Sequence, residues 1–200
     1  MTKENDVNIG GMHVELFMPG ENVAGNTVVI PELPHGSNIV NIVSGTEDLS
    51  DCDALMTRNH NLSLGIKTAD CAPVCFSDGE KIGIAHIGWR GLCLGLIGKM
   101  LNEFEATSLS VYVAPFLHSF TIQKDFCYEQ ITQKFGERFI THQFGELIFR
   151  FKDAITSLLP PQTVYDSRNT ASDPSFPSYR RNKTDKRFIT VVRFQKSWKS

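Results

Sequence analysis

Five short apolar runs follow one another in the first half of the chain, each flanked by residues that favour turns. The runs occupy residues 26–30, 38–43, 62–66, 72–76 and 81–87. Runs of this length between Gly, Asn, Asp or Ser residues are typical of β-strands. The Asp-Gly pair within residues 77–80 favours a tight hairpin. The last two runs should therefore pair antiparallel, which brings Cys71 and His86 toward the same end of the ladder.

The apolar spacing changes after Gly91. Apolar residues now recur every three or four positions and predict an amphipathic helix over 91–105. Further helices are predicted at 125–137 and 145–158, and further strands at 109–115 and 187–194. Several strands before the first helix, with helices interleaved later, indicate an α+β fold: a single domain with mixed β-sheets flanked by helices. The polar loop 166–182 is long enough to expect a functional role or disorder.

Composition narrows the class of protein. Two hundred residues with 41% apolar content predict one domain with a sizeable core. A net charge of −2 argues against general affinity for nucleic acid or an anionic membrane. The polar start MTKENDVNIGG does not resemble a signal peptide, and no apolar run approaches the ~20 residues that span a bilayer. Five cysteines, an odd number, do not predict a disulfide framework, so we expect a reducing, cytoplasmic setting.

The C-terminal segment is the one strongly basic part of the chain. From Arg180 to Lys199 it holds eight Lys or Arg residues and one acid, Asp185. The ordinary interpretation of such a run is a solvated strand and terminus. The alternative is that one or two of its arginines reach an anionic substrate.

Three potential metal ligands stand out among the histidines and cysteines. His35 lies in a Pro-His-Gly turn, Cys71 precedes a predicted strand, and His86 lies near the end of a predicted buried strand, where an unpartnered imidazole is costly. Two His and one Cys form a donor set that suits zinc with one position left open, as in catalytic sites. Spacing alone indicates such a site only weakly, because no dense metal-binding motif is present.

Several motifs resemble one known family. The strings TADCAPV (68–74) and AHIGWRG (85–91) are similar to the signature of the laccase-domain, or multicopper-polyphenol-oxidase-like, family, which includes peptidoglycan editing factors and purine nucleoside phosphorylases. The strings PHGSNIVNIV (34–43), DCDALMT (51–57) and FPSYRRNKTDKRFITVV (176–192) resemble further elements of that family. The resemblance extends from about residue 30 to 194. It implies one laccase-like domain over 1–200, with residues 1–25 divergent or flexible.

The resemblance also implies an activity and a metal. By position, the ligands of the family fall on His35, Cys71 and His86. The implied function is zinc-dependent phosphorolysis of purine nucleosides with deamination of adenosine, so the expected partners are a purine nucleoside and phosphate, without nucleic acid or membrane. The oligomeric state is left open. Oxidation of phenols is disfavoured, because one His-Cys-His site does not supply several copper centres.

Other side chains are candidates around that site. Asp70 could accept a hydrogen bond from a ligand or carry a proton, or could be an ordinary turn carboxylate. Arg90 suits phosphate through its planar fork, or could form a salt bridge at a helix start. Arg180 and Arg181 are further phosphate candidates, and His118 is expected beside the substrate. Trp89 and the remaining cysteines are expected in packing roles.

Departures from the family pattern keep alternatives open. The segment APFLHSFTIQK (114–124) differs from the usual family motif, with His118 at a position where the family has glycine. Such changes affect the substrate region more than the metal. One alternative is a thiol hydrolase with Cys71 as nucleophile and His86 as its base. Another is a family member that binds a ligand or partner without turnover.

Overall fold

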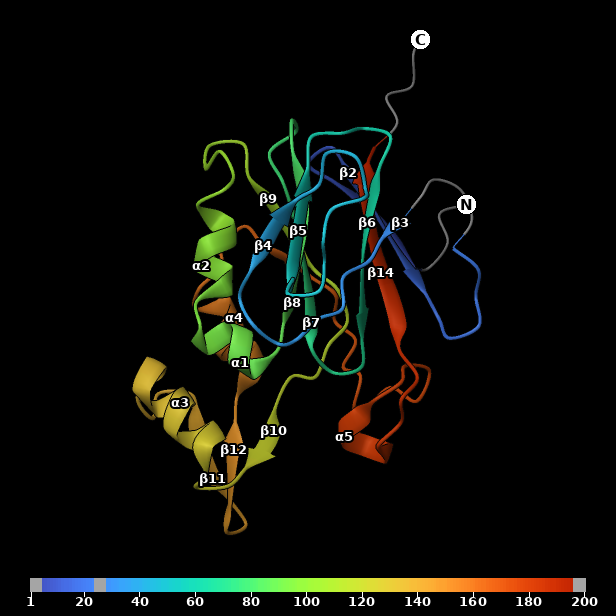
Figure 1. The fold of residues 1–200 in the computed structure, drawn as a ribbon. Helices are drawn as coiled ribbons and strands as arrows, with labels where there is room; N and C mark the ends of the chain where they lie inside the picture. Colours follow the sequence, from blue (N-terminus) through green and yellow to red (C-terminus); the bar gives the residue numbers. More distant parts are fainter. Residues whose placement is uncertain (1–4, 24–27, 196–200) are drawn as a thin grey trace.

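Two larger β-sheets lie face to face, with helices outside one of them and a small third sheet at one end (Figure 1). The structure, a computed structural model, describes residues 5–23 and 28–195. The fold is a single mixed α+β domain, so the class predicted from the apolar pattern is confirmed.

The first sheet has five strands in the order β1-β2-β14-β6-β3. Their bounds are Asp6–Ile9 for β1, Met12–Phe17 for β2, Phe188–Phe194 for β14, Ser63–Thr68 for β6 and Val28–Val29 for β3. The predicted strand 26–30 contains β3, and its first two residues lie outside the described part of the chain. The β1–β2 hairpin was not predicted, although buried residues alternate along β2.

The second sheet has six strands in the order β13-β9-β7-β8-β5-β4. Their bounds are Val164–Tyr165 for β13, Ser110–Val113 for β9, Ala72–Ser77 for β7, Ile82–Ile87 for β8, Ala54–Thr57 for β5 and Ile39–Asn41 for β4. The predicted β7–β8 hairpin is confirmed, with Gly79 at a φ of 89° in its turn. The register pairs Ala72 with Ile87 and Pro73 with His86, which places Cys71 beside His86.

Two apolar layers hold the sheets and helices together. One lies between the sheets, where residues of β2, β6 and β14 pack on residues of β5, β8 and β9. The other lies between the six-stranded sheet and the helices α1 (Trp89–Cys93), α2 (Leu96–Leu101) and α4 (Phe151–Thr156). Gly83 lies close beneath this layer: a Cβ there would lie 2.9 Å from side-chain atoms of Met100 and Phe104, so those side chains would have to shift.

Two predicted helices differ from the structure. The helix predicted over 91–105 is two short helices, because Gly95 adopts a left-handed φ of 78° between α1 and α2. The segment 145–158 begins as strand β12 (Glu146–Phe149) and becomes helical only in α4. A turn at Phe144 and Gly145, both at positive φ, reverses the chain before β12.

The strand β12 belongs to a separate three-stranded sheet in the order β10-β12-β11. Its other strands are β10 (Phe120–Ile122) and β11 (Ile140–Gln143), and α3 (Phe126–Phe135) matches the helix predicted at 125–137. The short helix α5 (Tyr179–Asn182) lies within the long loop that precedes β14. No helix in the described residues combines the length and apolar character that a membrane crossing requires.

Candidate metal centre and cavity

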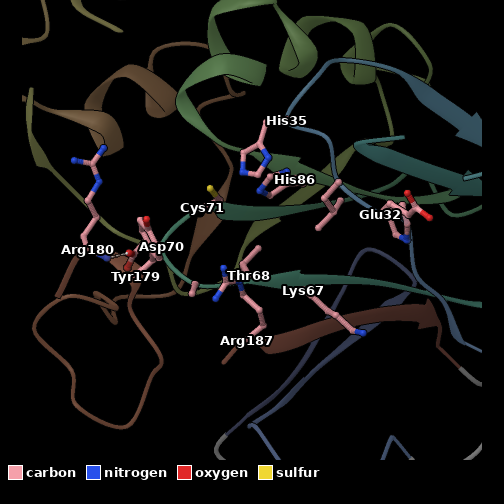
Figure 2. Close-up of a pocket in the computed structure, with 13 residues that line it drawn as sticks. Glu32, His35, Lys67, Thr68, Asp70, Cys71, His86, Tyr179, Arg180 and Arg187 are labelled. Atoms are coloured by element: carbon pink, nitrogen blue, oxygen red, sulfur yellow. Dashed lines mark hydrogen bonds between the residues drawn. The ribbon is translucent and has the colours of Figure 1, made fainter. Parts of the chain in front are cut away.

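His35, Cys71 and His86 meet at one end of the six-stranded sheet (Figure 2). Their donor atoms, one from each residue, all lie within 4.8 Å of one another. The two imidazole rings are edge to face, with centroids 4.8 Å apart. His86 is buried, Cys71 is partly exposed and His35 is exposed. The β7–β8 register explains why Cys71 lies beside His86. His35 comes from a different part of the chain, a turn before β4 in which its φ is 67°.

Asp53 connects the two histidines, although its role was not predicted from the sequence. This fully buried carboxylate accepts a hydrogen bond from His86 Nδ1 at 2.9 Å. It also accepts backbone bonds from His35 N at 3.1 Å and Gly36 N at 2.6 Å. The carboxylate therefore fixes both the turn that carries His35 and the ring of His86. With Nδ1 donating to Asp53, Nε2 of His86 is left as the nitrogen that can bind a metal.

The charges of the site reinforce one another. Burial raises the pKa of the Cys71 thiol, but hydrogen bonds from His35 and His86 outweigh it and lower the pKa to about 6. Burial favours the neutral form of His86, but its bonds to Asp53 and Cys71 raise the pKa of the ring to about 9. Burial also raises the pKa of Asp53, and the bond from His86 with those from the backbone brings it below its usual value. In the metal-free protein this favours a thiolate beside an imidazolium.

Glycine at position 88 lets the strands and the turn close on one point. A Cβ added there would lie 3.2 Å from Cys71 Sγ and 3.6 Å from His35 Cδ2. A side chain there would therefore crowd the sulfur of Cys71, while its contact with the His35 ring would be an ordinary one. This is a physical reason for the glycine in the string AHIGWRG.

The donor set fits zinc. Zinc is bound in proteins by imidazole nitrogen and thiolate sulfur, and a ligating histidine commonly donates its other N–H to a carboxylate. Cys71 has the lowered pKa that a thiolate ligand needs, and Asp53 is the carboxylate partner of His86. Three protein donors leave a coordination position free for water or substrate.

A cavity of about 510 Å³ opens onto the three donors. This volume lies within the roughly 300–1,000 Å³ typical of small-molecule sites. Besides the three donors, the lining comprises Pro31, Glu32, Leu33, Lys67, Thr68, Ala69, Asp70, Tyr179, Arg180 and Arg187. Its charged members are three cations and two acids, so the cavity favours a ligand with an anionic part. A smaller hollow of about 60 Å³, lined by Trp89, Leu117, Phe120 and Phe151 among others, also reaches Cys71.

Asp70 lines the cavity, but its carboxylate is already engaged. One oxygen accepts a bond from Thr170 Oγ1 at 2.8 Å, and the other accepts a bond from the backbone N of Arg180 at 2.7 Å. Asp70 is buried and has a φ of 91°, a left-handed conformation that is costly outside glycine. These contacts tie α5 and the long loop to the strand that carries Cys71.

The two adjacent arginines of α5 have different surroundings. Arg180 lines the cavity, and its guanidinium lies over the ring of Phe120 at 4.3 Å and donates to the Thr121 carbonyl at 3.2 Å. Arg181 instead donates to four backbone carbonyls of the long loop, those of Thr170, Ala171, Asp173 and Phe176. The guanidinium of Arg181 thus holds the loop together, and it does not line the cavity.

Arg90 and His118 also lie outside the cavity lining. Arg90 is exposed, with its guanidinium 5.1 Å from the centre of the Trp89 ring. His118 is half-buried against Phe116, and burial lowers the pKa of its ring. Its Nε2 is buried, without a hydrogen-bond partner among the described residues. The roles expected for Arg90 and His118 stay predictions.

Sequence reasoning did not single out five residues of the site: Asp53, Glu32, Lys67, Tyr179 and Arg187. Asp53 lies in the string DCDALMT, so a signal was present, but its link to both histidines spans 18 and 33 residues of chain. Arg187 lies in the basic C-terminal segment, where nothing in the sequence ranks one cation above another, and Tyr179 lies just before that segment. Lys67 and Glu32 carry no distinctive pattern.

Comparison with known proteins gives the family. A family model described as multi-copper polyphenol oxidoreductase laccase matches residues 15–195. The chain therefore belongs to this family, as the motifs at 68–74 and 85–91 predict.

Relatives and solved structures agree with that placement. The chain is 29% identical over 172 residues to the purine nucleoside phosphorylase of Aquifex aeolicus (strain VF5), with 82% of each chain covered. It is 24% identical over 195 residues to the purine nucleoside phosphorylase YfiH of Escherichia coli (strain K12), covering 90% of this chain and 80% of the relative. A solved structure of the Neisseria meningitidis protein NMB0706 has a TM-score of 0.81 at 18% identity, covering 96% of this chain and all of that one. The structure of Bacillus licheniformis YfiH has a TM-score of 0.73 at 23% identity, with 84% and 74% covered. These two structures support the fold alone.

Proposed function

We propose that the protein is a zinc-dependent purine nucleoside phosphorylase that also deaminates adenosine. The observation that carries the proposal is the cluster of His35, Cys71 and His86 at the wall of a cavity whose charged lining residues are three cations and two acids. Similarity to proteins named purine nucleoside phosphorylase over most of the chain supports it. The five cysteines are free, which agrees with action in a reducing cytoplasm.

The ligands of the zinc would be His35, Cys71 and His86. When bound there, zinc would lower the pKa of a water molecule toward neutrality, as deamination of an adenine ring requires. Asp53 would keep the His86 ring oriented, with its proton on Nδ1. Asp70 would hold α5 against the cavity, so that Tyr179 and Arg180 face the substrate. Arg180 would place its guanidinium beside the nucleoside, and Glu32 would accept hydrogen bonds from ribose hydroxyls.

The proposal is tested by following adenosine with the purified holoprotein. We expect adenine and ribose 1-phosphate to appear only with inorganic phosphate, and inosine to appear without it. Both activities should fall by about 100-fold or more in His86→Ala, because a metal ligand is removed. The matched control is His142→Ala, since His142 is exposed on β11. Equal product formation by the two variants would mean that the activity belongs to a contaminant or to another site.

A thiol hydrolase is the second candidate, and the lowered pKa of Cys71 beside His86 favours it. The two functions differ in how the thiolate reacts. A zinc-bound Cys71 should resist iodoacetamide until the metal is chelated, whereas a catalytic thiolate should be alkylated at once. Mass spectrometry of the alkylated peptide distinguishes them. A family member that only binds its ligand would form no product in the adenosine assay.

Phenol oxidation by several coppers receives less support. Among the described residues, two groups have donor atoms close enough to hold a metal. One is His35, Cys71 and His86, and the other is Asp6, His13 and Glu15 on strands β1 and β2 of the five-stranded sheet. Glu15 of the second group already pairs with Arg193, and His13 lies 3.5 Å from Glu15. That group therefore has the composition of an ion-pair network.

A further inference from the structure

The cavity wall opposite His35 and His86 carries two cations that sequence reasoning did not select, Arg187 and Lys67 (Figure 2). Arg187 immediately precedes β14, and Lys67 lies on the neighbouring strand β6. Phe188 pairs with Thr68 and Ile189 with Lys67. Because side chains alternate along a strand, Arg187 and Lys67 emerge on the same face as diagonal neighbours. Two cations from adjacent strands therefore share one wall of the cavity.

These cations have donors to spare. Arg187 uses one terminal nitrogen on the carbonyls of Thr184 and Lys186, at 3.0 and 2.8 Å. Its Nε and its other terminal nitrogen make no hydrogen bond within the described residues. The two bonds therefore orient the guanidinium and leave N–H donors available for a ligand. Lys67 forms no ion pair or hydrogen bond within the described residues either.

The other arginines near the site are less suited to hold an anion. The guanidinium of Arg181 is occupied by four carbonyls. Arg180 is partly committed to the Phe120 ring and the Thr121 carbonyl. Arg90 lies outside the cavity lining. Of these four arginines, only Arg187 lines the cavity, has a guanidinium oriented by backbone carbonyls and keeps N–H donors available.

We propose that Arg187, with Lys67, binds the inorganic phosphate consumed in phosphorolysis; this rests on the proposed function. A planar guanidinium binds tetrahedral oxyanions through paired N–H groups, and an ammonium adds a point charge. In the reaction, a phosphate oxygen forms a bond to C1′ of the ribose while the bond from C1′ to the base breaks. The electron pair leaves with the base, which takes up the proton of hydrogen phosphate. The products are ribose 1-phosphate and free base.

The test uses Arg187→Gln, with Arg58→Gln as the matched control. Arg58 forms an exposed ion pair with Glu80 and lies outside the cavity. Initial rates of adenine release are measured while phosphate and adenosine are varied in turn. We expect the KM for phosphate to rise about tenfold or more in Arg187→Gln, as for loss of a charge-assisted contact, with the KM for adenosine within about twofold. An unchanged KM for phosphate, or an equal rise for both substrates, would overturn the proposal.

Two further measurements separate this inference from the proposed function and from a folding defect. Lys67→Gln removes an exposed ammonium without partners in the described residues, so it should fold normally and raise the KM for phosphate about threefold. Calorimetric titration of the holoprotein with inorganic phosphate requires no turnover. If phosphate binds and Arg187→Gln weakens it about tenfold, the subsite stands even where adenosine is not cleaved. If adenosine is cleaved and neither variant affects phosphate, the subsite is wrong and the proposed function stands.

Discussion

Replacing Asp53 by Asn should separate the orientation of the donors from their identity. The change leaves His35, Cys71 and His86 in place and is nearly isosteric. Asp53 accepts three bonds, two on Oδ1 from His35 N and His86 Nδ1, and one on Oδ2 from Gly36 N. An Asn side chain has one oxygen. Its NH₂ must therefore face either the Gly36 N–H, now 2.6 Å from Oδ2, or the His86 ring.

Both orientations carry a cost that the structure allows to be estimated. An NH₂ toward Gly36 leaves a partly buried backbone donor without its partner, which costs about 1 kcal/mol of folding free energy. An NH₂ toward His86 favours the ring tautomer with its proton on Nε2, and that nitrogen then cannot bind a metal. Loss of such an orienting carboxylate typically weakens metal binding by about 10–100-fold.

The assay is competition for zinc between the protein and a chelator, with urea unfolding in parallel. The matched control is Asp51→Asn, which removes the same charge two residues away, where Asp51 is exposed and accepts a bond from Asn38 Nδ2. We expect weaker zinc binding and lower stability for Asp53→Asn alone. Equal zinc affinity in the two variants would refute the reasoning that Asp53 orients the site.

Two further predictions concern the buried carboxylate of Asp70 and the partly buried carboxylate of Asp166. Asp70→Asn should raise the KM for adenosine about tenfold by loosening α5, while kcat keeps the shape of its pH profile; a large fall in kcat with loss of one limb would instead identify Asp70 as a proton carrier. Burial raises the pKa of Asp166, but bonds from Arg168 outweigh it and leave the pKa below the usual value. The stability from this pair is therefore present above the unfolded pKa of about 3.9 and is lost as pH falls through the folded pKa. In urea unfolding, Asp166→Asn should be about 1–3 kcal/mol less stable at neutral pH, with a difference that shrinks in acid; a difference independent of pH would contradict this.

The β7–β8 hairpin and the proximity of Cys71 to His86 could be predicted because their causes are local. An Asp-Gly turn and two apolar runs fix the register, and the register fixes which residues meet at the end of the ladder. The arrival of His35 depends on the buried carboxylate of Asp53, a contact across the fold that no spacing reveals. The string DCDALMT around Asp53 could indicate that this residue has a role in the site. It could not show that the Asp53 carboxylate binds both histidines.

Errors in the secondary structure also have identifiable causes. Two-residue hairpin turns with positive φ at both positions usually contain Asn-Gly or Asp-Gly. Phe144 occupies the first such position before β12, so the sequence lacks the usual turn pair there. The apolar residues that follow were therefore predicted to form a helix. Glycine weakens a helix but does not by itself end one, and the left-handed φ of Gly95, which separates α1 from α2, is a backbone conformation that the apolar spacing does not specify.

X-ray diffraction from crystals of the purified protein at the zinc absorption edge tests the central claim most directly. The account predicts one strong anomalous peak bonded to Cys71 Sγ, His86 Nε2 and a ring nitrogen of His35, with a fourth position open toward the cavity. A peak elsewhere, or anomalous signal only at the copper edge, would contradict the assignment of these three residues as the zinc ligands of an enzyme.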